Sequence, residues 1–102
     1  MPVEFPWLSS ASTVLQAFFG GNDVGNGIAD VIFGKVNPSG KLPITWGKKL
    51  DDWPSHGNFG DDVTTVYKEG ISVGYRFFDR GENPKSDFAF GHGLSYTTFG
   101  IS

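Results

Sequence analysis

Residues 20–43 constrain the fold more than any other stretch, because a cluster of glycines leads into the one clear helical pattern of the sequence. Ile28, Val31 and Ile32 recur at helical spacing, so one apolar stripe of a short helix is expected to face a core. Gly34 comes just past this pattern, where a left-handed glycine commonly ends a helix. The stretch therefore predicts a helix that ends at Gly34.

The residues after Gly34 predict a turn and then a strand. Residues 37–40 read Asn-Pro-Ser-Gly, which favours a tight turn because Pro fixes φ and Gly accepts a positive φ. Residues 41–46 are expected to run extended. A short helix that leads into a short apolar strand is half of an α/β unit, and the other half is expected just upstream.

Residues 13–19, TVLQAFF, are the upstream candidate. Their length and continuous apolar character suit a strand buried on both faces, as in a parallel sheet, and a short helix shows the same pattern. We favour the strand, with residues 14–18 buried on both faces, because Gly20 and Gly21 follow at once. The fold class predicted for residues 13–46 is α/β, as strand, helix and strand.

The second half of the chain has weaker signals. Residues 47–66 form a polar loop, and residues 66–79 are expected to be extended, with Val73, Tyr75 and Phe77 on one face. Residues 94–99 alternate in the manner of a last strand, which would be an edge without a partner. With 15 Gly, 6 Pro and one visible helix in 102 residues, we expect something outside these residues to complete the core.

Charge and composition exclude several classes of partner. The net charge is −3 and the basic residues cluster only at Lys48 and Lys49, which argues against nucleic acid and anionic membranes. The sequence has no cysteine, so we expect no disulfide and no thiolate metal site. It has no apolar run of about 20 residues and no signal-peptide pattern at residues 1–4, and the compartment stays open.

Four blocks of the sequence, in this order, carry a resemblance to a known family. They are NGIADVIFG at 26–34, VNPSGKLP at 36–43, EGISVGYRFFD at 69–79 and FGHGLSYTTF at 90–99. Together they resemble glycoside hydrolase family 3, and specifically its fungal β-glucosidases, over nearly the whole chain but only over a late segment of the family's protein. The resemblance implies the end of an α/β sandwich domain at 1–47, a wrapping linker at 48–87 and the start of a fibronectin-type-III-like domain at 88–102.

The resemblance also implies an activity and the absence of its catalytic groups. Family 3 β-glucosidases hydrolyse terminal β-linked glucose with retention, and the substrate would be bound by the full-length enzyme. The family's nucleophilic Asp lies in an N-terminal barrel and its acid/base Glu lies upstream of residue 1, so neither matches a position here. We therefore expect no catalytic, cofactor-binding or metal residue in this chain, no cofactor, and no activity of the chain alone.

One departure from the family lies in the glycine cluster. Where the family often has Pro-Gly-Gln-Glu, residues 20–23 read Gly-Gly-Asn-Asp, so each polar side chain is one methylene shorter and reaches less far toward the cleft.

The acidic residues of the chain are better explained by structure than by catalysis. A retaining glycosidase needs two carboxyl groups about 5 Å apart. The pairs at 51–52 and 61–62 lie in the polar loop and are expected to be solvated. For Glu69 we favour an ion pair with Arg76 or a loop cap.

Other motifs are also assigned to structure. Residues 70–74 match G-x-S-x-G, but a nucleophile elbow needs a helix after the Ser, and β-favouring residues follow. Residues 91–93, Gly-His-Gly, lack the third glycine of a dinucleotide fingerprint. His56 and His92 are expected to be structural. Five aromatic residues have rings that suit sugar stacking, but packing is favoured for most of them: Trp7, Trp46, Trp53, Phe59 and Tyr67.

Two alternatives stay open beside the β-glucosidase segment. One is a non-catalytic interaction module that docks on a partner, or on itself, through unpaired strands. The other is a truncated reading frame without a function.

Overall fold

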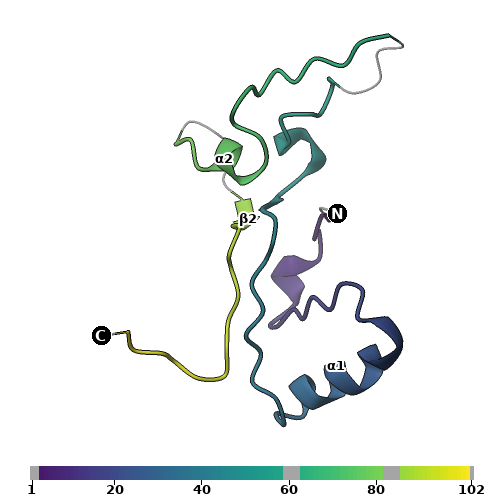
Figure 1. Ribbon diagram of the computed structural model, residues 1–102, viewed down its shortest axis with the longest axis vertical. Coiled ribbons are helices and arrows are strands. Elements are labelled where there is room, and N and C mark those ends of the chain that lie inside the picture. The colour runs from purple at the N-terminus through teal and green to yellow at the C-terminus, as the bar shows by residue number, and fades with distance from the viewer. Residues whose placement is uncertain (1–2, 59–62, 82–85, 102) are drawn as a thin grey trace. The chain divides into compact units, whose positions relative to one another are not determined.

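The structure is a computed structural model that describes residues 3–58, 63–81 and 86–101. Its helices are α1 (Val24–Ile32) and α2 (Tyr75–Phe78), and its strands are β1 (Trp46–Gly47) and β2 (Ser86–Phe88) (Figure 1). Short 3-10 turns lie at Leu8–Ser10, Gly21–Asp23 and Leu50–Asp52. The chain forms two compact units: unit 1 is Met1–Pro6 with Lys41–His92, and unit 2 is Trp7–Gly40 with Gly93–Ser102.

Helix α1 of unit 2 confirms the helix that the sequence predicts. It spans nine residues, and its apolar residues Val24, Ile28 and Val31 are half-buried. The expectation that Ile32 also faces a core is wrong, because its side chain is 61% exposed. Gly34 has a φ of 73° and its N–H donates to Val31 O at 3.0 Å, so a left-handed glycine ends the helix.

Other features of unit 2 differ from the prediction. Residues 13–19 form no hydrogen-bonded strand, and Val14, Leu15 and Phe18 are exposed rather than buried on both faces. The physical reason is that the neighbours of a parallel strand are not among the described residues. The chain turns at residues 33–36, where Gly34 supplies the positive φ, and not at 37–40.

The last residues of unit 2 are held by side-chain hydrogen bonds instead of a strand ladder. Residues 94–99, expected as a strand, have no strand assignment. The Tyr96 hydroxyl donates to Val31 O at 2.7 Å, and the Tyr96 N–H donates to Asn37 Oδ1 at 2.8 Å. The Ser95 hydroxyl donates to Pro38 O at 2.6 Å. These bonds fasten the segment to the end of α1 and to the loop that follows it.

The sheet of unit 1 is a two-stranded antiparallel ribbon. Trp46 faces Phe88 in its register, and the pairing is irregular between Trp46 and Gly47. The two segments stay paired beyond the strands, because Leu42 exchanges backbone hydrogen bonds with residues 91 and 92, each at 2.8 Å. The ribbon brings residues 42–47 beside residues 86–92, and the paired residues are 39 to 50 positions apart in the sequence.

The core of unit 1 is a group of three aromatic rings. The Trp46 ring lies 4.8 Å from the Phe5 ring and 6.0 Å from the Phe88 ring, measured between centroids. Trp46 is 2% exposed. Burial of one large apolar side chain contributes about 1.5–3 kcal/mol, and each tilted or edge-to-face ring pair adds about 0.5–1.5 kcal/mol. Trp46 is therefore the centre of the packing in unit 1.

The extended segment predicted over residues 66–79 is wrong at two places, because residues 68–71 form a turn and residues 75–78 form α2. Gly74 precedes the helix with a φ of 66°, which interrupts the alternation of a strand. The Asp79 N–H donates to Tyr75 O at 3.0 Å, and the Phe78 ring packs edge-on against Trp53 at 5.2 Å. Tertiary packing thus overrides the β-propensity of Tyr-Arg-Phe-Phe.

Candidate functional site

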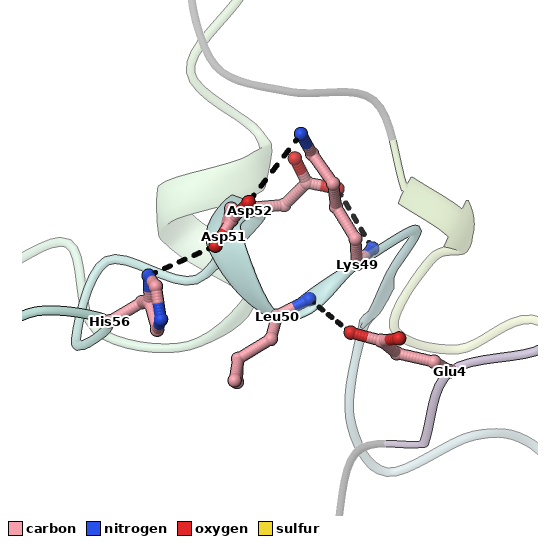
Figure 2. Close-up of polar contacts among 6 residues, drawn as sticks. All are labelled: Glu4, Lys49, Leu50, Asp51, Asp52 and His56. Carbon is pink, nitrogen blue, oxygen red and sulfur yellow. Dashed lines mark hydrogen bonds and ion pairs between the residues drawn. The ribbon is translucent and has the colours of Figure 1, made fainter.

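A group of polar residues surrounds the 3-10 turn at Leu50–Asp52 in unit 1. The Glu4 carboxylate accepts a hydrogen bond from the Leu50 N–H, and Asp52 Oδ2 accepts one from the Lys49 N–H at 3.0 Å (Figure 2). Asp52 is buried. The prediction that residues 51 and 52 are both solvated is therefore wrong for Asp52, since its carboxylate satisfies the backbone donor at the start of the turn.

Asp51 is 64% exposed, as predicted. Its carboxylate lies 3.3 Å from His56 Nδ1 and 3.7 Å from Lys49 Nζ (Figure 2). Exposed ion pairs of this kind contribute about 0–1 kcal/mol. Asp51 and Asp52 thus have separate structural contacts and do not form a pair that could act together on a glycosidic bond.

The remaining acidic candidates also lack a catalytic arrangement in the described residues. Glu69 is half-buried, but it forms no ion pair with Arg76, whose guanidinium lies over the Tyr75 ring at 5.8 Å. That part of the prediction is not confirmed. Asp61 and Asp62 lie outside the described residues.

The G-x-S-x-G segment is not a nucleophile elbow, although one reason given from the sequence does not hold. A helix, α2, does follow Ser72. However, residues 68–71 before it form a turn and not a strand, and Ser72 is 3% exposed. An elbow needs a strand before the Ser and an exposed hydroxyl, so Ser72 does not lie in a nucleophile elbow.

A small apolar pocket lies in unit 1. Its volume is about 160 Å³. It is lined by Pro43, Ile44, Thr45, Trp53, Gly74, Tyr75 and Phe90. The Tyr75 and Phe90 rings are stacked at 4.6 Å, and the Thr45 hydroxyl accepts a hydrogen bond from the Phe90 N–H at 3.1 Å. No carboxyl group lines this pocket, so it can hold an apolar group but offers no acid or nucleophile.

The five aromatic residues considered for sugar stacking have different surroundings. Trp46 is a packing residue of the core, as favoured from the sequence. Trp53 is half-buried and forms part of the pocket wall, whereas Trp7 and Tyr67 are exposed. Phe59 lies outside the described residues. Tyr75 and Phe90 carry no sequence signal that marks them as a pair, because their rings meet only through the tertiary packing of α2 against residue 90.

The described residues contain neither a metal-binding cluster nor a helix that could span a membrane. Within the described ranges, no three His, Asp or Glu side chains are grouped so that they could hold a metal ion. None of the helices in the described ranges has the length and apolar character that crossing a membrane requires. The His92 ring lies against Phe88 at 5.3 Å, which is a packing contact.

Residues 1–96 match the family model described as the glycosyl hydrolase family 3 C-terminal domain. The chain therefore belongs to the glycosyl hydrolase family 3 C-terminal domain family. This finding confirms the resemblance seen in the four sequence blocks.

Individual relatives agree with the family match. The chain is 56% identical over 99 residues to "Probable beta-glucosidase I" of Emericella nidulans. This match covers 96% of this chain and 12% of that protein. It is similar to the crystal structure of a β-glucosidase from Kluyveromyces marxianus in complex with glucose, with a TM-score of 0.90 and 50% sequence identity. The match covers 95% of this chain and 12% of the Kluyveromyces marxianus chain. β-Glucosidase 3B from Thermotoga neapolitana, also in complex with glucose, gives a TM-score of 0.87 and 39% identity over 95% of this chain and 14% of that one. The chain thus spans about an eighth of the length of these relatives.

Proposed function

We propose that these residues are a structural, cleft-supporting part of a β-glucosidase, an enzyme that hydrolyses terminal β-D-glucosyl residues with retention. The observation that carries the proposal is the TM-score of 0.90, at 50% identity, with a β-glucosidase that holds glucose. The pocket without a carboxyl group supports the second part of the proposal, that both catalytic carboxylates belong to other parts of the enzyme.

The proposal includes an assignment of domains. Residues 1–47 would complete an α/β sandwich, in which residues 13–19 form an interior strand beside α1. Residues 48–87 would wrap over the enzyme, and residues 88–102 would begin a fibronectin-type-III-like domain. The amphipathic α1 and the exposed apolar residues at 14–19 support this assignment, since both are suited to a larger layered core. The β-glucoside substrate would be bound by the whole enzyme.

A graft tests whether the segment serves a β-glucosidase. In the graft enzyme, residues 1–96 replace the matching segment of the Kluyveromyces marxianus β-glucosidase. We expect the graft enzyme to hydrolyse an aryl β-glucoside with a kcat/KM within about tenfold of the parent, because a supporting part with the right shape keeps the reacting groups in place. A soluble, folded graft enzyme without activity would contradict the proposal.

The isolated chain is the matched control for the graft enzyme. We expect no release of product above buffer, because one stray carboxylate cannot supply both a nucleophile and an acid. Saturable turnover by the isolated chain, abolished by Glu69→Gln, would make Glu69 catalytic and overturn the proposal.

Gly47 gives a prediction about the wall of the pocket. A Cβ at Gly47 would lie 3.2 Å from Trp53 Nε1 and 3.4 Å from Phe78 Cζ, whereas a Cβ at Gly81 would meet nothing within 4 Å. In the graft enzyme we expect Gly47→Val to lower the free energy of unfolding by about 1–3 kcal/mol through overpacking. Gly81→Val is the control, with an expected loss of less than about 1 kcal/mol. Urea unfolding measures the free energy of unfolding of both variants. Equal losses for the two variants would contradict the prediction, because they would show that the Trp53 side chain moves aside without a cost.

A further inference from the structure

An Asn-Gly pair, Asn26 and Gly27, lies in the first turn of helix α1. Asn26 is exposed, and its side-chain Nδ2 donates a hydrogen bond to Asp23 Oδ1 at 2.5 Å. A Cβ built on Gly27 would meet nothing within 4 Å. The backbone nitrogen of Gly27 therefore has open space beside it and no side chain of its own to screen it.

An asparagine that precedes glycine can lose its side-chain amide without an enzyme. The backbone nitrogen of Gly27 attacks Cγ of Asn26, ammonia leaves, and a succinimide ring closes. Water then adds to one of the ring carbonyls and opens the ring to either aspartate or isoaspartate. The net reaction takes up water and releases ammonia. A side chain on the following residue would hinder the attacking nitrogen, so glycine is the most favourable residue at that position.

The sequence has four other asparagines, and none of them precedes glycine. Asn37 and Asn83 precede proline, which has no backbone N–H to give up. Asn22 precedes an aspartate and Asn58 precedes a phenylalanine, so a side chain hinders the attack at both. Ring closure is therefore least hindered at Asn26.

Helix α1 holds this reaction back. The ring closes only when ψ of Asn26 leaves the helical range, because a helical backbone carries the nitrogen of the next residue away from Cγ. The hydrogen bond to Asp23 also turns the Asn26 side chain toward the start of the helix and away from Gly27. However, α1 has only nine residues, and Gly25 and Gly27 both favour its opening. The reaction therefore follows local opening of the first turn.

We propose that Asn26 is a site of spontaneous deamidation and that helix α1 sets its rate. This inference goes beyond the proposed function, since it needs neither a substrate nor a catalytic group. Either product places a carboxylate beside Asp23, where the amide donated a hydrogen bond, and adds one negative charge to a chain whose net charge is −3. Isoaspartate also lengthens the backbone by a methylene, which disrupts the hydrogen-bond spacing of the first turn.

Peptide mass spectrometry of the isolated chain tests the site without requiring the chain to fold. The chain is incubated at mildly alkaline pH, and each asparagine is followed for conversion to aspartate and isoaspartate. We expect Asn26 to convert at least about tenfold faster than any other asparagine, because only its following residue combines a backbone N–H with the absence of a side chain. Gly27→Ala is the matched control and should remove this difference. A rate at Asn26 no higher than at Asn22, or an unchanged rate in Gly27→Ala, would overturn the proposal.

The graft enzyme tests the role of the helix. In the folded graft enzyme we expect Asn26 to convert at least about tenfold more slowly than in the isolated chain, because the reaction waits for local opening. Gly25→Ala keeps the Asn-Gly pair, and a Cβ at Gly25 also meets nothing within 4 Å. It should slow the reaction by a further factor of about two to five, which is the helix preference of alanine over glycine expressed as a rate.

Two outcomes in the folded graft enzyme would overturn the role of the helix. One is a rate at Asn26 equal to that in the isolated chain. The other is slow conversion on which Gly25→Ala has no effect, because this would show that the rest of the enzyme covers Asn26. These rates do not depend on activity, so a folded but inactive graft enzyme would refute the proposed function and leave this test in force.

Trifluoroethanol gives a second measurement of the helix effect in the isolated chain, because it enriches helix in a chain without a fixed fold. It should slow conversion of Asn26 more in the parent chain than in Ile28→Pro, where a proline inside α1 prevents the helix. Equal slowing in the two chains would be an effect of the solvent alone and would contradict the role of the helix.

Discussion

A urea titration of the isolated 102-residue chain, followed by Trp fluorescence, is expected to show no cooperative unfolding transition. The signal should change gradually from the lowest urea concentration, and sedimentation at two protein concentrations should show self-association. For comparison, a folded domain of this size unfolds in one transition with a slope of about 1–3 kcal/mol/M in urea.

The physical reason is the balance between burial and chain entropy. A stable small domain has a net stability of only about 5–15 kcal/mol, after the cost of ordering its backbone has been met by apolar burial. Here only Phe5 and Trp46 are buried among the apolar residues of the described part. Phe19 and Ile101 are fully exposed, and α1 contributes no buried side chain. Burial of this extent cannot offset the ordering of about a hundred residues.

The contrary result would be easy to recognise. A single transition that does not depend on protein concentration, from a monomer and with a slope within that range, would show that the chain is an independently stable domain. The graft enzyme is the positive control, because the same residues should then unfold cooperatively together with their surroundings.

The helix was the feature of the fold that local sequence could predict best. The spacing of Ile28, Val31 and Ile32 and the glycine at 34 are local signals, and α1 with a left-handed Gly34 confirms them. The structure agrees because nothing distant is needed to place a turn of helix or its glycine end.

Features that depend on distant residues were harder to predict. Residues 13–19 have the composition of an interior strand, but they have no strand assignment and their large apolar side chains are exposed. Residues 75–78 have high β-propensity, but Gly74 and the contact of Phe78 with Trp53 favour a helix there. In both cases the deciding contact lies outside the local sequence.

In the candidate site, too, features set by the local sequence could be predicted and features set by tertiary contacts could not. The exposed Asp51 follows from the polar sequence around it, whereas the burial of Asp52 depends on the geometry of the turn that it caps. The pocket could not be predicted, because it depends on the stacking of Tyr75 in α2 on Phe90, a tertiary contact that no local pattern indicates. The family itself was recognisable because its motifs are short, local and in order.

Trp46→Ala in the graft enzyme is expected to have the largest effect of any single substitution in this segment. The change removes the ring that contacts both Phe5 and Phe88 and leaves a cavity at the only fully buried large side chain of the described residues. Truncation of a buried Trp typically lowers the free energy of unfolding by about 3–5 kcal/mol. A loss of this size would remove much of the stability of an ordinary domain, and we expect soluble, active enzyme to decrease in parallel.

Trp46→Phe is the matched control, because it keeps an aromatic ring against Phe5 and Phe88 and removes only part of the indole. We expect it to retain most of the stability, with a loss of about 1–2 kcal/mol, since the cavity is smaller and ring contacts remain. Urea unfolding of the parent graft enzyme and the two variants measures the difference, and kcat of the folded fraction should be unchanged in all three. If Trp46→Ala cost no more than Trp46→Phe, the three rings would not be the core of unit 1. If kcat fell without a loss of stability, Trp46 would have a role in catalysis that its burial does not suggest.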